Sequence, residues 1–283
     1  MKRFMVLRSA IKKVAVLGML AVVALAITTL AIAQRGRGWN REIRPENVDR
    51  GGVPVWENDE RFKRDVFTFV RIKYSSYGDY RFGKWATDYP DSDLNFSFRL
   101  HELTSLDVDP NGKILELTDD ALLDYPWAYL IEPGRMFLDE AEVEGMRRYL
   151  LNGGFIMVDD FWGEAEWENF REQLRRVFPD REPVELSLDH EIFHCVYDLK
   201  WKPQVPSIHA WMNGFSTERP DAPEAHYRAL YDDKGRMMMI ICHNTDLGDG
   251  WEREGMDRGY FQEFSEKWSY PMGINIVTYA MTH

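Results

Sequence analysis

Residues 127–160, WAYLIEPGRMFLDEAEVEGMRRYLLNGGFIMVDD, decide the fold class of this chain. Trp127–Ile131 is an apolar run typical of a buried strand, and Asp139 can cap a helix that follows it. The apolar positions of that helix recur at helical spacing: Val143, Met146, Tyr149 and Leu150. Two glycines end the helix, and Phe155–Val158 returns as a second strand. Strand, helix, short turn and strand form a βαβ unit, which predicts parallel strands joined by a right-handed connection.

Outward from this unit, the alternation of strands and helices continues. Val66–Ile72 is rich in β-branched and aromatic residues, as buried strands are. Residues 225–231 and 237–242 flank a polar, glycine-containing turn and predict a hairpin. Further elements follow from the same criteria: helices at 92–104, 167–177 and 271–279, and a short strand at 184–187. This order indicates an open, mostly parallel α/β sheet covered on both faces, in which ligands bind at the carboxyl ends of the strands.

The first 33 residues predict a secretory signal. Five basic residues precede the uninterrupted apolar run Val14–Ala33, which ends in the small-x-small sequence Ala31-Ile32-Ala33. Cleavage at this site is the preferred interpretation, although about 20 apolar residues are also long enough for an uncleaved membrane anchor. Either alternative carries the rest of the chain out of the cytoplasm, to the periplasm or cell envelope. Residues 34–63 are then predicted to be a linker, and residues 64–283 one α/β domain.

The charge of the chain limits its partners. It carries 35 Lys and Arg residues against 47 Asp and Glu residues. Without the five basic residues of the signal segment, 30 remain against 47, a net charge of −17. A surface this acidic repels phosphate backbones, so nucleic acid is not an expected partner. Envelope glycans, peptides or proteins remain as partner classes, and the membrane is a partner only if the N-terminal segment stays uncleaved.

Four stretches, in this order along the chain, resemble a bacterial protein family. They are residues 85–95 (WATDYPDSDLN), 129–134 (YLIEPG), 150–160 (LLNGGFIMVDD) and 275–280 (NIVTYA). The combination resembles domain-of-unknown-function family four-one-five-nine over about residues 64–282. That family is similar in fold to class I glutamine amidotransferase-like domains. The resemblance therefore implies a flavodoxin-like three-layer sandwich, and it implies no known activity.

The resemblance to amidotransferases ends at the residue that carries their chemistry. Those enzymes place a nucleophilic cysteine at the turn after a central strand, whereas the turn after Phe155–Val158 holds Asp159 and Asp160. A carboxylate cannot replace the thiolate as the nucleophile of amide transfer. Cys195 and Cys242 follow no such turn, and the sequence leaves open whether they form a disulfide. We therefore expect no amidotransferase activity.

The sharpest spacing motif is His190-Glu191-Ile192-Phe193-His194, which matches H-E-x-x-H. On a helix, both imidazoles lie on one face and can bind Zn²⁺, with the glutamate as general base. The segment lacks a clean helical stripe, and Tyr197 stands where the metzincin extension has glycine. Apart from this zinc hypothesis through His190, Glu191 and His194, no cofactor is expected.

Polar side chains follow two of the predicted strands. Asp159 and Asp160 follow the second strand of the βαβ unit, with Trp162 close behind, and His243 and Asn244 follow the second arm of the predicted hairpin. Paired carboxylates can share a proton, bind a cation or accept hydrogen bonds from sugar hydroxyls. The alternative is a helix cap and a polar turn. If the hairpin arm runs parallel to the other strands, its end joins the same edge of the sheet; otherwise it points elsewhere.

Aromatic side chains crowd the loop at residues 74–89. The candidate ligand contacts among them are Tyr74, Tyr77 and Trp85. Aromatic faces suit sugar rings and peptide side chains, so the loop is a candidate binding platform. The polar contacts of such a platform would come from the same region: Asp88, Asp93 and Asn95. The alternative is a loop that packs its own aromatic side chains into a small core.

These observations favour a non-catalytic ligand-binding or scaffold domain of the bacterial envelope. The turn that should carry a nucleophile lacks one, whereas aromatic and acidic side chains gather where the predicted strands end. The alternative is a hydrolase, zinc-dependent through the H-E-x-x-H segment or carboxylate-based through Asp159 and Asp160. A third interpretation is a structural domain anchored to the membrane. The backbone conformation of residues 188–196 tests the zinc hypothesis. A zinc site of this type requires a helix there, and an extended segment would exclude it.

Overall fold

A computed structural model describes residues 48–62, 65–77 and 83–283. The chain divides into two units, Met1–Ile43 and Arg44–His283, and the described residues all belong to the second. The predicted signal segment, residues 1–33, therefore lies outside the described residues. No helix within the described ranges is both long and apolar enough to span a bilayer.

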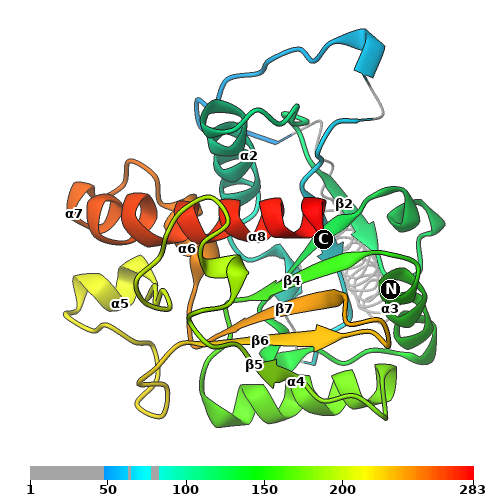
Figure 1. Cartoon of the computed structure of the whole chain (residues 1–283). Coiled ribbons are helices and arrows are strands. Elements are labelled where there is room, and N and C mark those ends of the chain that lie inside the picture. Colours follow the sequence, from blue (N-terminus) through cyan, green and yellow to red (C-terminus); the bar gives the residue numbers. More distant parts are fainter. Residues whose placement is uncertain (1–47, 63–64, 78–82) are drawn as a thin grey trace, which may run out of the picture. The chain divides into compact units, whose positions relative to one another are not determined.

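Seven strands form one sheet in the order β2-β1-β3-β4-β7-β6-β5 (Figure 1). Five of them run parallel: β1 (Val70–Lys73), β2 (Lys113–Glu116), β3 (Trp127–Ile131), β4 (Phe155–Asp159) and β7 (Met237–His243). At one edge of the sheet, β6 (His226–Tyr231) and β5 (Val184–Glu185) pair antiparallel with their neighbours. The predicted α/β class with a mostly parallel sheet is confirmed.

The βαβ unit predicted from the sequence is present. Helix α3 (Glu140–Leu151) begins after Asp139, whose side chain accepts a hydrogen bond from the backbone N–H of Glu142. The Glu142 carboxylate in turn accepts one from the Asp139 N–H, which completes a capping box. Gly154 is required before β4, because a Cβ atom there would lie 2.4 Å from the Tyr149 ring. The capping and turn residues therefore agree with the parallel pairing of β3 and β4.

Helices cover both faces of the sheet, with α4 on one side and α8 on the other (Figure 1). On one face, α3 packs against α4 (Gly163–Val177). On the other face, α2 (Asp91–Leu103), α6 (Leu247–Glu252) and α8 (Tyr270–Thr282) contact one another. The other helical segments are α5 (Ile208–Met212), α7 (Arg258–Tyr260), the π-helix η7 (Phe261–Ser269) and the 3-10 turns η2 (Glu60–Phe62), η3 (Lys84–Ala86), η4 (Asp120–Asp124), η5 (Pro133–Arg135) and η6 (Glu191–Phe193).

Strand β7 is both the second arm of a hairpin and a member of the parallel sheet. It pairs antiparallel with β6, and it pairs parallel with β4 through Ile156 opposite Met239. The two arrangements that the sequence left open for this strand are therefore both realised. As a consequence, β7 ends at the same edge as β4, and the Asp160 N–H donates to the Thr245 carbonyl oxygen at 3.2 Å.

The described part of the predicted linker packs against the α/β domain. The Trp56 indole N–H donates to the Val108 carbonyl oxygen at 2.7 Å, so residues 48–62 contact the domain.

Cys195 and Cys242 are both free thiols. Cys242 is fully buried in β7, where an unpaired thiol packs as a small apolar side chain. The question of a disulfide that the sequence left open is thereby answered.

A buried ion pair joins β1 to α2. The Arg71 side chain is fully buried, and its Nε donates to both carboxylate oxygens of Asp93, at 3.1 and 3.0 Å. Its other nitrogens donate to the carbonyl oxygens of Trp85 and Thr87, at 2.9 Å each, and to Ser92 Oγ at 2.8 Å. Each nitrogen of the guanidinium therefore has a partner, and the turn that leads into α2 is held against the sheet.

Replacing Asp93 with alanine is expected to destabilise the domain by about 3 to 5 kcal/mol, because it leaves the buried Arg71 guanidinium without its counter-charge. Chemical denaturation of the full chain measures this loss. Glu144→Ala is the matched control, since it removes the partner of Arg147 in an exposed pair and should cost less than about 1 kcal/mol. Equal losses in the two variants would contradict a special role for the buried pair.

Candidate functional site

The carboxyl ends of the parallel strands carry backbone strain. Four non-glycine residues in the described chain have a positive φ angle: Asp88 at 60°, Glu132 at 49°, Asp160 at 55° and Asn244 at 61°. The last three directly follow β3, β4 and β7, and the first lies in the segment after β1. A left-handed conformation costs about 1 kcal/mol or more for a residue with a Cβ atom, and such strain clusters at functional sites. We therefore take this edge of the sheet, the carboxyl edge, as the candidate site.

Five carboxylates gather at the carboxyl edge and form an acidic cluster: Asp88, Asp160, Asp246, Asp249 and Glu252. Oxygen atoms of Asp88, Asp160 and Asp246 lie within 4.8 Å of one another, and so do oxygen atoms of Asp88, Asp249 and Glu252. Asp88 belongs to both groups of three and therefore links them. Like charges this close repel each other, so the cluster favours bound protons or a positively charged ligand.

Backbone contacts fix two of these aspartates at the start of α6. Asp246 caps the helix, and its Oδ1 accepts a hydrogen bond from the Asp249 N–H at 2.7 Å. Asp249 Oδ2 accepts from the Ile208 N–H at 2.5 Å and from the Tyr260 hydroxyl at 3.3 Å. The Asp246 N–H donates to the Val205 carbonyl oxygen at 2.8 Å. These bonds tie the segment before α5 to the end of β7.

Trp162 and Gly248 border the other two aspartates. The Trp162 indole N–H donates to Asp160 Oδ1 at 3.1 Å. A Cβ atom at Gly248 would lie 2.9 Å from Asp88 Oδ2 and 2.6 Å from the Tyr129 hydroxyl, so glycine lets α6 approach Asp88 closely. Asp88 Oδ2 is itself buried and accepts no hydrogen bond from the described residues. The strained turns at Asp88 and Asp160 thus position both carboxylates in the acidic cluster.

Burial gives these carboxylates unusual proton affinities. Burial, and after it the repulsion between like charges, raises the pKa of Asp88, Asp160 and Asp246 well above the ordinary range of a carboxyl group. Burial also raises the pKa of Glu252 to about 7. Perturbed carboxyl groups of this kind cluster at functional sites more often than elsewhere in proteins.

Arg253 compensates one side of the acidic cluster. Its Nε lies 3.2 Å from Asp249 Oδ1 and 2.6 Å from Glu252 Oε2. Within the described ranges, no ion pair of this kind joins the other three aspartates to a cation. The uncompensated negative charge is therefore concentrated on those three side chains.

Asp159, predicted together with Asp160, takes a different position. It is the last residue of β4 and is fully buried. Its Oδ2 accepts hydrogen bonds from the Tyr129 hydroxyl at 3.0 Å and from the Gly248 N–H at 2.9 Å. Burial raises the pKa of Asp159 to about 7. Asp159 therefore connects β3, β4 and α6, whereas its neighbour Asp160 belongs to the acidic cluster.

Four of the predicted ligand contacts make structural contacts. The Tyr74 hydroxyl donates to two carbonyl oxygens at the end of β3, at 2.7 Å each. Asn95 donates to a carbonyl oxygen of α6 at 2.8 Å, and Asp93 is the partner of Arg71. Trp85 is buried. These side chains hold the carboxyl edge together, and of the predicted polar contacts in this region Asp88 is the one that reaches the acidic cluster.

Tyr77 lies apart from the cluster. Its side chain is 52% exposed, and its ring centroid is 4.7 Å from that of Phe137. Two further aromatic residues of the predicted platform, Tyr80 and Phe82, lie outside the described residues. The buried Tyr74 and Trp85 agree with the alternative of a loop that packs its own aromatic side chains.

His243 and Asn244 brace the start of α4. His243 Nε2 donates to the Gly163 carbonyl oxygen at 3.2 Å, and its Nδ1 accepts from Arg228 at 3.1 Å. Burial lowers the pKa of His243 to about 3, so its ring is neutral. Asn244 accepts from the Gly163 N–H at 2.8 Å and donates to the Glu224 carbonyl oxygen at 2.9 Å. His243 is the last residue of β7 and Asn244 follows it, and the polar atoms of both side chains are used within the fold.

The H-E-x-x-H segment does not form the helix that a zinc site needs. Glu191–Phe193 is a single 3-10 turn, and both ring nitrogens of His194 are engaged: Nδ1 with Asp198 at 2.7 Å and Nε2 with the Leu188 carbonyl oxygen at 2.7 Å. The hydrogen bond with Asp198 raises the pKa of His194, while burial lowers the pKa of His190. The helical geometry behind the zinc hypothesis is therefore absent.

The sequence matches one family of domains over most of its length. Residues 68–281 match a family described as a domain of unknown function (DUF4159). The chain belongs to this family. The resemblance inferred from the four sequence stretches is thereby confirmed at the level of the family, whose description assigns no activity. No curated protein matches the chain.

Sequence reasoning missed three members of the acidic cluster: Asp246, Asp249 and Glu252. A signal was present, because these residues recur every three positions after a predicted strand and suit a capped helical turn. That signal points to the carboxyl edge only once β7 is known to run parallel to β4. All three residues lie inside the family match.

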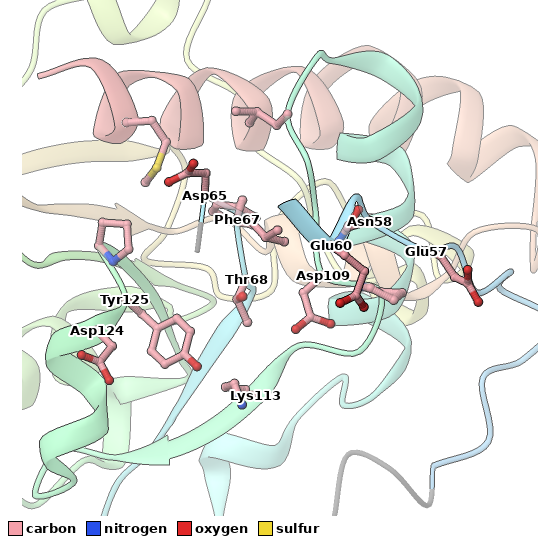
Figure 2. A pocket seen from close by; sticks show the side chains of 15 residues that line it. Glu57, Asn58, Glu60, Asp65, Phe67, Thr68, Asp109, Lys113, Asp124 and Tyr125 are labelled. Carbon is pink, nitrogen blue, oxygen red and sulfur yellow. The ribbon is translucent and has the colours of Figure 1, made fainter. Parts of the chain in front are cut away.

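A pocket of about 1260 Å³ lies at the opposite edge of the sheet, before the starts of β1, β2 and β3 (Figure 2). Asp109 and Asp124 line opposite sides of it in this view. The wall contributed by Glu57, Asn58, Glu60 and Asp65–Phe67 precedes the family match. Among the described residues, no lining residue of this pocket belongs to a group of three side chains that could together bind a metal ion. The carboxyl edge is therefore the better candidate site.

The stability of the ligand-free chain is expected to fall as the pH rises from about 5 to about 8 in the presence of a chelator. Asp159 and Glu252 have folded-state pKa values of about 7, above the unfolded value of about 4. The folded state therefore holds protons that the unfolded chain releases, and the stability they contribute below about pH 4 is lost as the pH rises through about 7. Thermal unfolding should show a decrease in Tm of about 5 to 10 °C.

The double variant Asp160→Asn, Asp246→Asn tests the origin of this dependence. It removes two further carboxyl groups whose pKa values burial raises, and with them protons that the folded state holds and the unfolded chain releases, so its Tm should fall less with pH than that of the wild type. Asp233→Asn, which neutralises an exposed carboxylate paired with Arg181, is the control and should follow the wild type. An unchanged pH dependence in the double variant would mean that the cluster does not set it.

Proposed function

We propose that this chain is an exported, non-catalytic binding domain of the bacterial cell envelope, and that its ligand brings positive charge to the acidic cluster. The observation that carries the proposal is the group formed by Asp88, Asp160 and Asp246 at the carboxyl edge, which has no cation partner among the described residues. Asp160 and Asp246 are buried, and Asp88 is half-buried. Candidate ligands of this chemistry are an amine-bearing peptide or glycan of the envelope and a metal ion.

The energetics of the acidic cluster support a binding role. Carboxylates taken out of water lose hydration, and their mutual repulsion adds to that loss. Neutral or apolar side chains at the same positions would make a more stable domain. A cluster that lowers the stability of the free protein is typical of a site that is completed by its ligand.

The topology supports the same position for the site. The parallel strands follow the order β2-β1-β3-β4-β7, which corresponds to the order 2-1-3-4-5 of flavodoxin-like sheets. We propose that the domain is a flavodoxin-like, amidotransferase-like sandwich with an added antiparallel edge. In such sheets the strand order reverses between β1 and β3, and ligands bind there at the carboxyl ends. Asp88 and Glu132 follow these two strands.

The thiols of the chain support a non-catalytic role. The turn after β4, where an amidotransferase has its cysteine, holds Asp160. Burial raises the pKa of Cys242 well above the ordinary range, and burial also raises that of Cys195, whose Sγ donates to the Asn275 carbonyl oxygen. A nucleophilic thiol needs the opposite, a lowered pKa and access to substrate.

Hydrolysis by carboxylates is the second candidate function. Its supporting observation is Asp159, whose pKa of about 7 suits general acid–base catalysis near neutral pH. Asp159 is fully buried and bonded to Tyr129 and Gly248, so a substrate cannot reach it without a rearrangement of α6. This burial favours a structural role for Asp159 and places the binding proposal first.

Export is part of the proposal and rests on the N-terminal sequence. The basic residues, the apolar run Val14–Ala33 and the Ala31-Ile32-Ala33 sequence are the features of a secretory signal. An acidic domain outside the cytoplasm meets millimolar divalent cations and amine-bearing envelope polymers. Both are the kind of ligand that the acidic cluster attracts.

The binding proposal predicts that a positively charged probe stabilises the full chain. The purified protein, kept in a mild detergent, would be titrated at pH 7.5 with tetralysine, a glucosamine tetramer and the chlorides of divalent metals. At least one probe should raise Tm by about 5 °C or more at saturation, because it binds the folded state alone. Isothermal titration calorimetry would then give its Kd.

The double variant Asp160→Asn, Asp246→Asn should weaken the binding of that probe at least about tenfold, while Asp233→Asn should leave the Kd unchanged. The double variant should also be more stable than the wild type without probe, since it loses the repulsion. If no probe binds, or if the double variant binds as well as the wild type, the proposed function is wrong.

A further inference from the structure

The spacing of three carboxylates suits one metal ion. Oxygen atoms of Asp88, Asp160 and Asp246 lie within 4.8 Å of one another. Mg²⁺ and Ca²⁺ bind oxygen at about 2.0 to 2.6 Å, so two ligand oxygens on one ion lie up to about 4 to 5 Å apart. The three carboxylates come from three separate segments, after β1, β4 and β7, and converge on one point of the carboxyl edge.

A buried oxygen atom without a hydrogen-bond donor, Asp88 Oδ2, points independently to a bound ion. Asp160 is 7% exposed and Asp246 is 4% exposed. The Oδ1 atom of each accepts a hydrogen bond, from the Trp162 indole N–H and from the Asp249 backbone N–H. Asp88 Oδ2 is buried and has no donor among the described residues. Buried polar atoms nearly always have a partner, and a metal ion held by the three carboxylates supplies one for Asp88 Oδ2.

The second group of three carboxylates is a poorer metal site. Both oxygens of Asp249 are engaged, Oδ2 by the Ile208 N–H and Oδ1 by Arg253. Arg253 also lies 2.6 Å from Glu252 Oε2. A guanidinium thus already supplies the positive charge on this side. The matched control residue is instead Asp233, an exposed carboxylate that is paired with Arg181 and lies outside the acidic cluster.

We infer that Asp88, Asp160 and Asp246 bind a single hard divalent cation, of the class of Ca²⁺, Mg²⁺ and Mn²⁺. The inference rests on the proposed function and names its ligand. The donors are all carboxylate oxygens, which suit these ions, while zinc sites draw on histidine or cysteine. Three carboxylates fill fewer than the six or more positions that these ions require. The remaining positions are open to water or to oxygen atoms of a glycan or peptide.

The test is a direct titration of the full chain after chelation and desalting. CaCl₂, MgCl₂ and MnCl₂ would be added in separate calorimetric titrations at pH 7.5. One of these ions should bind with a stoichiometry of about one per chain and with a Kd in or below the range of about 10⁻⁴ to 10⁻³ M of extracellular calcium modules. The same ion should raise Tm in a concentration-dependent way.

Single substitutions locate the ion. Asp160→Asn and Asp246→Asn should each raise the Kd at least about tenfold, and Asp233→Asn should leave it within about threefold of the wild type. Circular dichroism checks that each variant is folded, and the wild-type titration decides the question even where a variant is not. If no ion binds the wild type, or if folded Asp160→Asn and Asp246→Asn variants bind normally, the inference is wrong.

The amine probes separate this inference from the proposed function. If tetralysine or the glucosamine tetramer binds through Asp160 and Asp246 while no metal binds, the binding function stands and the metal inference is overturned. If neither class of probe binds, both are wrong. Binding of a metal that is lost in Asp160→Asn and kept in Asp233→Asn supports both.

Discussion

The buried guanidinium of Arg71 is the interaction on which the carboxyl edge depends. An arginine without solvent contact needs partners for its donors, and here they come from Asp93 and from the turn before α2. The Thr87 carbonyl oxygen is one of these partners, and the next residue is Asp88. An ion pair inside the domain therefore sets the position of a carboxylate at its edge. These hydrogen bonds hold the segment before α2 against β1.

Two acidic environments lie side by side as a result. Asp93 has its charge met by Arg71, and it belongs to the framework of the fold. Asp160 and Asp246 are buried to a similar degree, yet no cation among the described residues meets their charge. Burial of a charge stabilises a protein only when geometry and partners are complete. The difference between these aspartates is the physical distinction between a structural group and a candidate binding group.

The sequence predicts an element well when the residues that determine it are neighbours in the chain, and poorly when they are distant. The βαβ unit was predictable because capping, helical spacing and glycine turns all act within residues 127–160. Strand β2 escaped notice because Lys113–Glu116 has charged ends and no buried residue, which removes the usual pattern. Membership of the acidic cluster depends on β7 pairing with both β6 and β4, which residue spacing alone does not decide.

The pair at the end of β4 shows why adjacent residues can have different roles. Asp159 closes the strand and bonds to Tyr129, whereas the backbone turns into the left-handed region at Asp160. The same turn recurs after β3 and β7, at Glu132 and Asn244. Each costs free energy that an ordinary turn with glycine would not. Strain repeated at three strand ends, beside charge that the fold leaves uncompensated, is hard to account for by folding alone. It argues that this edge is shaped by what it binds.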